Sequence, residues 1–412
     1  MTFNDLQLKK SILKSLTESG YENPTAIQQK CIPKILDGED VIATAQTGTG
    51  KTAAFALPII QMLLPFQDAS NHDKKIKALI IAPTRELAVQ ISDSFTSYAK
   101  YTNLRTSVVF GGTSIEPQKD ILRKGIDILV ATPGRLLDLH KQDLVNLDYA
   151  KQLVLDEADL LLEMGFIDDV KKIVRLCPEK KQILLFSATM PDKVVDLAST
   201  ILKNPTEISI SQISSAAKNV QQNLFYVPKP KKIELCLHLL RNTIKKGTTI
   251  IFRRTKFGVE KLEQTLQNNG YLVNSIHGDK SQSERQLALN QLKNNEITIL
   301  IATDLASRGL DIPSLDYVIN FDMPNVPEVY VHRIGRTGRA SEDGISLSFC
   351  AADEKGYVKS IESLLQKSIP VEENHPYPLD PAAKPIVHKK QGSKYKKGRK
   401  SEASKKKKKR WY

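Results

Sequence analysis

The sequence predicts an α/β protein of two tandem domains, each a parallel sheet flanked by helices, followed by a basic tail. At 412 residues the chain exceeds what one hydrophobic core usually supports. Short apolar runs typical of buried strands alternate with helical patterns, which indicates parallel sheets covered on both faces. This alternation lapses near residues 204–219 and then begins again. We therefore expect a first domain at 1–208, a linker at 209–219, a second domain at 220–369 and a disordered tail at 370–412.

The strongest single motif is a small-residue loop between the apolar run 41–43 and a helix start at 53–57. Two glycines allow the backbone N–H groups to surround an anion, a lysine adds a point charge, and a threonine hydroxyl can hold Mg²⁺. Ala45 stands where the strict pattern has glycine, and a plain Gly/Thr-rich turn is the alternative interpretation. The candidate phosphate-binding residues are Ala45, Gln46, Thr47, Gly48, Thr49, Gly50, Lys51 and Thr52.

The segment before this loop, residues 3–36, begins with Phe3 and contains two helical patterns separated by a turn. Thr25 and Gln28 have the spacing of a capping box at the start of the second helix. A helix cap is the simple interpretation of this pair, and a role in ligand binding is the alternative.

Polar clusters follow the predicted strands of the first domain. Because ligands bind beyond the carboxyl ends of the strands in an open parallel sheet, these clusters should share one edge with the phosphate loop. The strands are expected at 78–82, 106–110, 126–130, 153–155 and 183–186, and the clusters at 83–87, 111–112, 132–135, 156–159 and 187–189.

Two adjacent acids, Asp156 and Glu157, come directly after the strand at 153–155. A carboxylate at Asp156 can reach Mg²⁺ held between Thr52 and the phosphates, and Glu157 can orient or deprotonate an attacking water. Two acids after a strand also fit a surface turn. The phosphate loop upstream favours the catalytic interpretation.

The second domain repeats the architecture without a phosphate loop, with strands expected at 249–252, 272–276, 297–302, 317–321 and 345–349. It carries an arginine cluster at 332–339. Arg336 and Arg339 are candidates for fingers that cross a cleft and neutralise the departing γ-phosphoryl group. A structural set of salt bridges is the alternative. If closure also forms a polyanion groove, ATP and nucleic acid must bind cooperatively.

The net charge of +14 is concentrated in the tail, because residues 381–412 hold fourteen Lys and Arg against one acid. Residues 1–380 therefore carry only +1, and any nucleic acid bound there must be held by placed groups. The tail itself suits non-specific polyanion binding, with Trp411 and Tyr412 available to stack on bases. A solvated tail without function is the alternative.

Several classes of protein are disfavoured by composition. No apolar run reaches the length of a membrane-spanning helix, and the N-terminus lacks a signal-peptide pattern, so we expect a cytoplasmic protein. The four cysteines are far apart and suggest buried thiols, with neither a zinc site nor a disulfide framework.

In their order and spacing these motifs resemble the DEAD-box RNA helicases of superfamily 2, over roughly residues 3–350. Asp156-Glu157-Ala158-Asp159 is similar to the motif that names the family. The family's phosphate loop also has alanine at the position that Ala45 occupies here. The resemblance implies two RecA-like domains, ATP and Mg²⁺ as cofactors, and local, non-processive separation of RNA duplexes.

The resemblance also implies individual roles. Tyr21, Thr25 and Gln28 look like the Q motif, in which Tyr21 would stack on adenine and Gln28 would recognise its edge. Asp311 would meet the ATP ribose, and Ser187 with Thr189 would couple hydrolysis to strand separation. The residues similar to the family's RNA contacts are Thr84, Arg85, Gly111, Gly112, Thr132, Arg135, Gln282, Arg285 and Thr303.

The leading hypothesis is an RNA-dependent ATPase that bends and clamps single strands with little sequence preference and so opens short duplexes. An ATP-gated RNA clamp or assembly factor is the second hypothesis, and a processive DNA translocase is the third. The resemblance to compact bacterial members points to a monomeric core without membrane contact, with ribosome-assembly or RNA-decay factors as partners.

Overall fold

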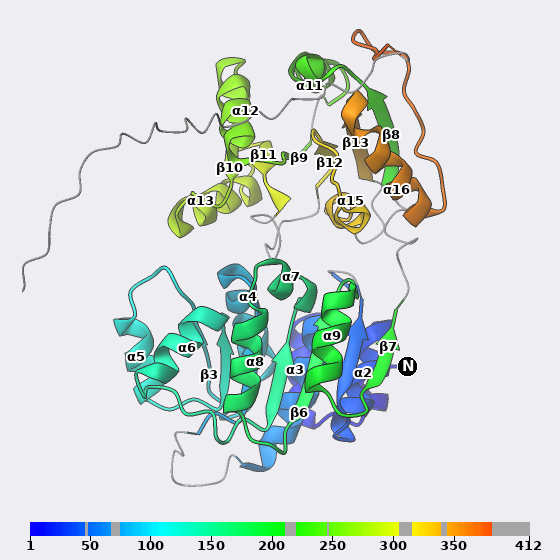
Figure 1. Cartoon of the computed structure of the whole chain (residues 1–412). Helices are drawn as coiled ribbons and strands as arrows, with labels where there is room; N and C mark the ends of the chain where they lie inside the picture. Colours follow the sequence, from blue (N-terminus) through cyan, green and yellow to red (C-terminus); the bar gives the residue numbers. More distant parts are fainter. Residues whose placement is uncertain are drawn as a thin grey trace, which may run out of the picture.

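The computed structural model describes residues 1–45, 48–66, 75–210, 220–244, 247–304, 315–338 and 344–380. These residues form two parallel sheets, each flanked by helices, and Figure 1 shows the two domains one above the other. The predicted α/β class and two-domain architecture are confirmed.

Within the described residues, the first sheet has seven parallel strands in the order β3-β4-β2-β5-β6-β1-β7. Strands β2, β4, β5 and β6 are buried along their whole length, because helices cover both faces of the sheet. The strands are β1 (Val41–Thr44), β2 (Ala78–Ile81), β3 (Thr106–Val109), β4 (Ile128–Ala131), β5 (Gln152–Leu155), β6 (Gln182–Ser187) and β7 (Thr206–Ser209).

Two hydrophobic clusters lie on opposite faces of this sheet. One joins the sheet to α1 through α4, with Phe55 and Phe95 at its centre, and the other joins it to α5 through α9. The helices are α1 (Lys10–Glu18), α2 (Ala26–Leu36), α3 (Lys51–Leu63), α4 (Arg85–Tyr98), α5 (Glu116–Arg123), α6 (Pro133–Lys141), α7 (Ala158–Glu163), α8 (Ile167–Leu176) and α9 (Asp192–Ile201).

The second sheet, counted over the described residues, has six parallel strands in the order β10-β11-β9-β12-β13-β8. Its strands are β8 (Val220–Tyr226), β9 (Thr249–Phe252), β10 (Val273–Ile276), β11 (Ile299–Ala302), β12 (Tyr317–Asn320) and β13 (Gly344–Cys350). The helices around it are α11 (Lys232–Asn242), α12 (Lys256–Asn268), α13 (Gln282–Lys293), α15 (Pro327–Ile334) and α16 (Lys355–Leu365).

Strands β7 and β8 were not predicted from the sequence, and both lie at sheet edges. In β7 only Ile208 is buried, and β8 mixes the exposed Gln221 and half-buried polar residues with buried apolar ones. An edge strand needs no continuous apolar run, so its sequence resembles that of a loop.

The segment at 370–380 differs from the prediction of a disordered tail that starts at 370. It runs along β8: Leu224 donates its N–H to the carbonyl of Pro370 at 2.8 Å, and Leu379 donates to that of Tyr226 at 2.9 Å. The His375 ring contacts Phe225 edge-on, with the ring centroids 5.6 Å apart. The remainder of the predicted tail, 381–412, lies outside the described residues, as does most of the predicted linker.

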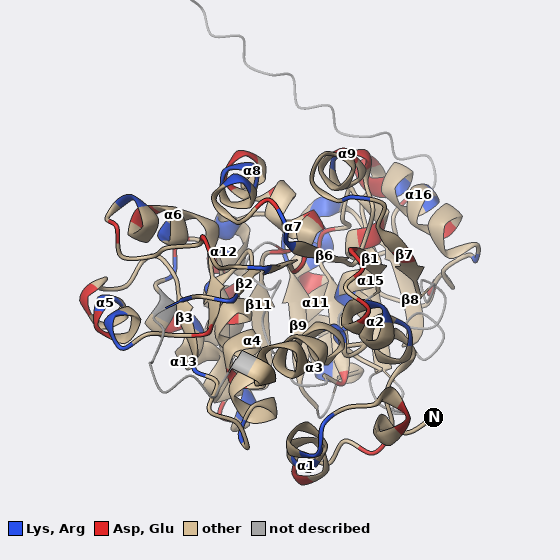
Figure 2. Ribbon diagram, turned by 90° about the horizontal axis from the view of Figure 1, so that it is seen from below, with Lys and Arg blue, Asp and Glu red and all other residues tan. Residues whose placement is uncertain are grey.

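Charged residues are interspersed over the underside of the molecule in Figure 2, in agreement with the near-neutral composition of residues 1–380. All four cysteines are buried and free, as predicted. None of the helices in the described part of the chain is long and apolar enough to cross a bilayer.

Candidate functional site

The described end of the loop between β1 and α3, residues 48–50, has backbone angles that suit an anion-binding turn. Gly48 and Gly50 adopt φ angles of 85° and 91°, in the left-handed region that glycine enters without strain. Lys51 opens α3 and is only 7% exposed. Its Nζ has no hydrogen-bond partner among the described residues. Because a buried ammonium without a partner is costly, this position fits the phosphate of a ligand.

The predicted Thr25–Gln28 pair is a helix cap and also a contact to the phosphate loop. Thr25 caps α2, and its backbone N–H donates to Gln28 Oε1 at 2.9 Å. Gln28 Nε2 donates to the carbonyl of Gly50 at 3.1 Å. A Cβ added at Gly50 would lie 2.4 Å from Gln28 Nε2, so only glycine permits this approach. The two interpretations of the pair are therefore compatible.

Tyr21 lies beside this cap, with its ring held in place by two other aromatic side chains. Its hydroxyl lies 2.9 Å from that of Tyr98, and its ring meets Phe3 edge-on with a centroid separation of 6.4 Å. The ring remains partly exposed. An exposed, oriented ring of this kind can stack on a planar ligand.

The two acids after β5 are buried. Asp156 Oδ1 accepts the backbone N–H of Glu157 at 3.0 Å, and burial raises the pKa of Asp156 while Lys51 acts to lower it. Burial also raises the pKa of Glu157 to about 7, against the lowering effects of Lys51 and Arg336. Glu157 has a φ of 49°, a strained backbone conformation of the kind found at functional sites.

Asp159 joins the acidic cluster at 156–159 to the end of β6. Its Oδ2 accepts two hydrogen bonds from Thr189, at 3.0 Å from the backbone N–H and 2.8 Å from the hydroxyl. Ser187 donates its hydroxyl to the Thr189 carbonyl at 2.7 Å and accepts the Asp159 N–H at 3.2 Å. Although burial acts to raise the pKa of Asp159, the Lys51 charge and the Thr189 bonds leave it below its usual value.

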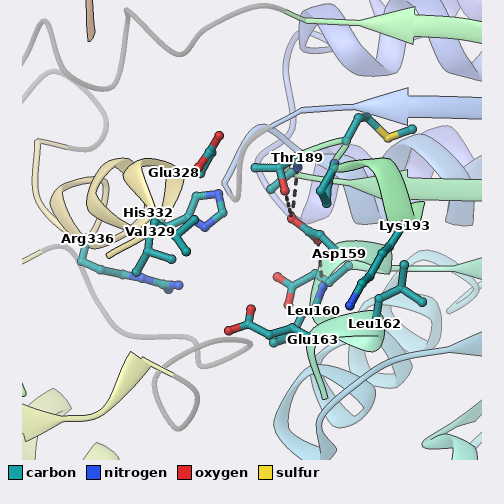
Figure 3. Close-up of a pocket in the computed structure, with 15 residues that line it drawn as sticks. Asp159, Leu160, Leu162, Glu163, Thr189, Lys193, Glu328, Val329, His332 and Arg336 are labelled. Atoms are coloured by element: carbon teal, nitrogen blue, oxygen red, sulfur yellow. Dashed lines mark hydrogen bonds between the residues drawn. The ribbon is translucent and has the colours of Figure 1, made fainter. Parts of the chain in front are cut away.

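A cavity of about 640 Å³ lies between the two domains at this point. Glu157, Asp159 and Thr189 line it from the first domain, and His332 and Arg336 line it from the second. Figure 3 shows Asp159 and Thr189 on the opposite side of the pocket from His332 and Arg336. His332 and Arg336 act electrostatically on Asp159 and Glu157 respectively, so the domains already interact across the cleft.

A second cavity, of about 680 Å³, also has walls from both domains. Lys280 and Ser281 line it but were not predicted from the sequence, and Gly134 lines it from the predicted cluster at 132–135. The predicted RNA-contact residues that line it are Thr84, Arg85, Gly111, Gly112, Thr132, Arg135 and Arg285. We call this cavity the groove.

The arginines of the groove are positioned by backbone contacts. A Cβ added at Gly112 would lie 1.6 Å from Arg85 Nη2, so the guanidinium rests directly on the glycine backbone. Arg135 Nη2 donates to the carbonyl of Thr113 at 2.9 Å. Both groups remain positively charged, which suits the phosphates of a polynucleotide.

Arg285 also makes a contact that the sequence analysis missed. Its Nη1 lies 2.9 Å from Oε1 of Glu86, so an ion pair joins the two domains across the groove. Glu86 stands next to Arg85 in the polar cluster after β2, and its position there was the only available signal.

Some predicted site residues are not placed. Gln46, Thr47, Asp311 and Arg339 lie outside the described residues, and the side chain of Gln282 is not described. Thr303 follows β11, where its N–H donates to the Ile276 carbonyl at 3.3 Å, and it does not line the groove.

Comparison with known proteins gives two matching family models, the DEAD/DEAH box helicase over residues 25–197 and the helicase conserved C-terminal domain over 231–341. The chain is 44% identical to the DEAD-box ATP-dependent RNA helicase RhpA of Helicobacter pylori over 347 residues, which cover 84% of this chain and 69% of the relative. This chain belongs to the DEAD-box helicase family. As a DEAD-box RNA helicase it is an ATP-hydrolysing enzyme, and the fold and enzyme class expected from the sequence are confirmed.

Solved DEAD-box structures resemble this helicase to different degrees. S. cerevisiae Dbp5 bound to RNA and ADP BeF3 has a TM-score of 0.78 at 28% identity, covering 90% of this chain and 95% of that one. A DEAD box protein from Methanococcus jannaschii has a TM-score of only 0.51 at 40% identity, with coverages of 90% and 99%. The more similar sequence thus gives the less similar overall structure.

Proposed function

We propose that this DEAD-box helicase is an RNA-dependent ATPase in which RNA-driven closure of the two domains completes one nucleotide site. The observation that carries the proposal is the division of charged groups across the cleft. Glu157 lines the cavity from the first domain, where Lys51 and Asp156 act on it electrostatically, and Arg336 lines the same cavity from the second. Neither domain alone holds the complete set.

Within this site, Lys51 would bind the phosphates and Glu157 would accept the proton of the attacking water. Arg336 would stabilise the charge that develops on the transferred phosphoryl group. Arg339 would join it, and Asp311 would meet the ribose. Tyr21 and Gln28 would recognise adenine, which makes ATP the preferred nucleotide.

The residues present fit a Mg²⁺ ion. Thr52 follows Lys51 at the start of α3, and one Asp156 oxygen is engaged by the Glu157 N–H while the carboxylate offers a second. These hard oxygen donors would hold Mg²⁺, which would supply charge neutralisation to the phosphates.

The groove would hold the sugar-phosphate backbone of single-stranded RNA, with Arg85, Arg135 and Arg285 contacting phosphates. Such contacts give little sequence preference and a strong dependence on salt. The structure resembles Dbp5 bound to RNA and ADP BeF3 more closely than it resembles the Methanococcus jannaschii protein, whose sequence is more similar. This difference supports the proposal that RNA changes the position of one domain relative to the other. Bending of one strand in the groove would separate short duplexes locally and without processive movement.

ATP hydrolysis with and without single-stranded RNA tests the proposal. We expect RNA to accelerate hydrolysis strongly and DNA to do so weakly. Equal turnover with no RNA present would contradict it. Release of more than one duplex strand per enzyme under multiple turnover would separate a helicase from an ATP-gated clamp, because a clamp releases no excess strand.

The bacterial relatives favour further proposals about context. We place the helicase in the cytoplasm as a monomer that works with ribosome-assembly or RNA-decay factors. Crosslinking of bound RNAs in cells, followed by sequencing, tests this: enrichment of neither ribosomal precursors nor decay intermediates would count against it.

A further inference from the structure

Phe257 is a large apolar side chain that the fold leaves in solvent. It is the second residue of α12 and is 73% exposed, more than any other large hydrophobic side chain in the described residues. The core-facing residues of the same helix, Val259, Leu262 and Leu266, are fully buried. Packing of the second domain therefore does not explain an aromatic ring at this position.

Three side-chain contacts join the first half of α12 to the loop that follows β10. Lys256 pairs with Asp279, Glu260 Oε1 lies 3.6 Å from His277 Nε2, and Glu263 Oε1 lies 3.5 Å from Lys280 Nζ. Gly278 and Lys280, on either side of Asp279, line the groove. Phe257 therefore lies beside a residue that is tied directly to the groove wall.

The surroundings of the ring suit a polyanion better than an apolar protein segment. Helix α12 follows the carboxyl end of β9, and Phe257 lies in its first turn. The helix dipole is positive at this end. Lys256 and Lys261, one residue before and four residues after, are both exposed. A flat apolar ring among cations is the combination that holds unpaired nucleobases, since phosphates meet the charges and a base meets the ring.

We propose that Phe257 stacks on an unpaired base of the RNA strand where that strand leaves the groove beside Lys280. This inference rests on the proposed function and adds a base-binding position to a groove that otherwise contacts the backbone. Stacking on a ring is sequence-tolerant because every base has an aromatic face, so it would strengthen RNA binding without introducing a sequence preference.

Binding of full-length protein to single-stranded RNA, with an ATP analogue present, tests the stacking position. We expect Phe257→Ala to raise the dissociation constant about tenfold and Phe257→Trp to leave it unchanged or lower it. Phe257→Leu should behave like Phe257→Ala, because it keeps apolar surface and loses the aromatic face. Leu272→Ala is the matched control, because Leu272 is also an exposed apolar residue of this domain, at 60% exposure. It precedes β10 at the amino ends of the strands, whereas Phe257 lies at the carboxyl ends, so binding should not change.

RNA of the same length with abasic sites separates base stacking from backbone contact. The unsubstituted protein should bind abasic RNA about tenfold more weakly, whereas Phe257→Ala should bind both RNAs alike. Equal loss for both proteins, or full affinity of Phe257→Leu for normal RNA, would overturn the stacking role. If RNA fails to stimulate ATP hydrolysis by the unsubstituted protein, the proposed function fails. If stimulation is present and Phe257→Ala binds normally, only this inference fails.

Discussion

The two domains place a lysine at the same position of the same fold and give it opposite surroundings. Strand orders β3-β4-β2-β5-β6-β1 and β10-β11-β9-β12-β13-β8 correspond, so β8 is the counterpart of β1. Lys51 opens the helix after β1, and Lys232 opens α11 after β8. Both are buried. Lys51 Nζ has no hydrogen-bond partner among the described residues, whereas Lys232 Nζ donates to Phe321, Phe349 and Glu354 at 2.8, 3.1 and 2.6 Å.

The carboxylates beside these lysines follow the same division. Asp156, after β5, has a pKa raised by burial. Asp322, after the corresponding strand β12, pairs with Arg253 at 2.9 Å, and although burial acts to raise its pKa, Arg253 and Lys232 leave it below the usual value. The second domain balances its buried charges internally. The first leaves them for a ligand, as expected of a site whose function costs stability.

The largest expected effect comes from removal of Arg336, the guanidinium that the second domain contributes to the cavity between the domains. Arg336→Ala should lower RNA-stimulated ATP hydrolysis by roughly 10³, because the transition-state charge would lose its guanidinium. ATP and RNA binding should change much less. Arg336→Lys is the control that keeps the charge without the planar fork, and it should recover only part of the rate. A change of a few-fold in single-turnover hydrolysis for Arg336→Ala would show that this arginine is structural.

Two matched substitutions, at Lys51 and at Lys232, test whether the two buried lysines contribute differently to stability. Lys232→Met should destabilise the second domain by about 3–5 kcal/mol, because the buried Glu354 carboxylate would lose its shortest ion pair and keep only that with Arg254. Lys51→Met should lower the melting temperature much less, since Lys51 Nζ makes no hydrogen bond among the described residues, while ATP binding weakens by about 100-fold. Thermal melting and nucleotide titration measure both effects. Equal destabilisation by the two changes would contradict the comparison.

A pH dependence follows from the raised pKa of Glu157, which is about 7. The carboxylate must be ionised to accept a proton, so kcat/KM for ATP should fall about tenfold per pH unit below that value. Burial favours the protonated form, so the stability from this group is lost as pH rises through about 7.

Glu157→Gln separates these two consequences. Hydrolysis should stop while ATP and RNA binding persist, and the variant should melt higher than the unsubstituted protein at pH 8 but not at pH 5. The gain at pH 8 should be on the order of 3 kcal/mol. Undiminished hydrolysis, or a higher gain at pH 5 than at pH 8, would rule out Glu157 as the buried base.

The smallest expected effect comes from removal of the basic C-terminal segment, residues 381–412, which follows the two domains. Removal of residues 381–412 takes away fourteen Lys and Arg, so the dissociation constant for RNA should rise roughly three- to tenfold and depend less steeply on salt. Saturated turnover should stay the same. A loss of saturated turnover would assign this segment to the catalytic body.

Local patterns in the sequence predicted most of the first domain's site. A glycine turn, a lysine and an acid pair after a strand are short motifs, and parallel topology brings them to one edge of the sheet. The contacts that were missed join distant segments: Gln28 to Gly50, and Glu86 to Arg285. No periodicity encodes such pairs, because they depend on how two finished helices or two domains meet.

The covering of the β8 edge by residues 370–380 is another long-range contact that the sequence did not predict, and it has a practical consequence. Among the described residues, strand β8 has a neighbouring strand, β13, on one side only. Residues 370–380 run along its other side through hydrogen bonds to Leu224 and Tyr226. A shortened protein ending at residue 366 would uncover those backbone groups and invite strand pairing between molecules. A protein ending at 380 would keep them shielded and stay dispersed at the same concentration.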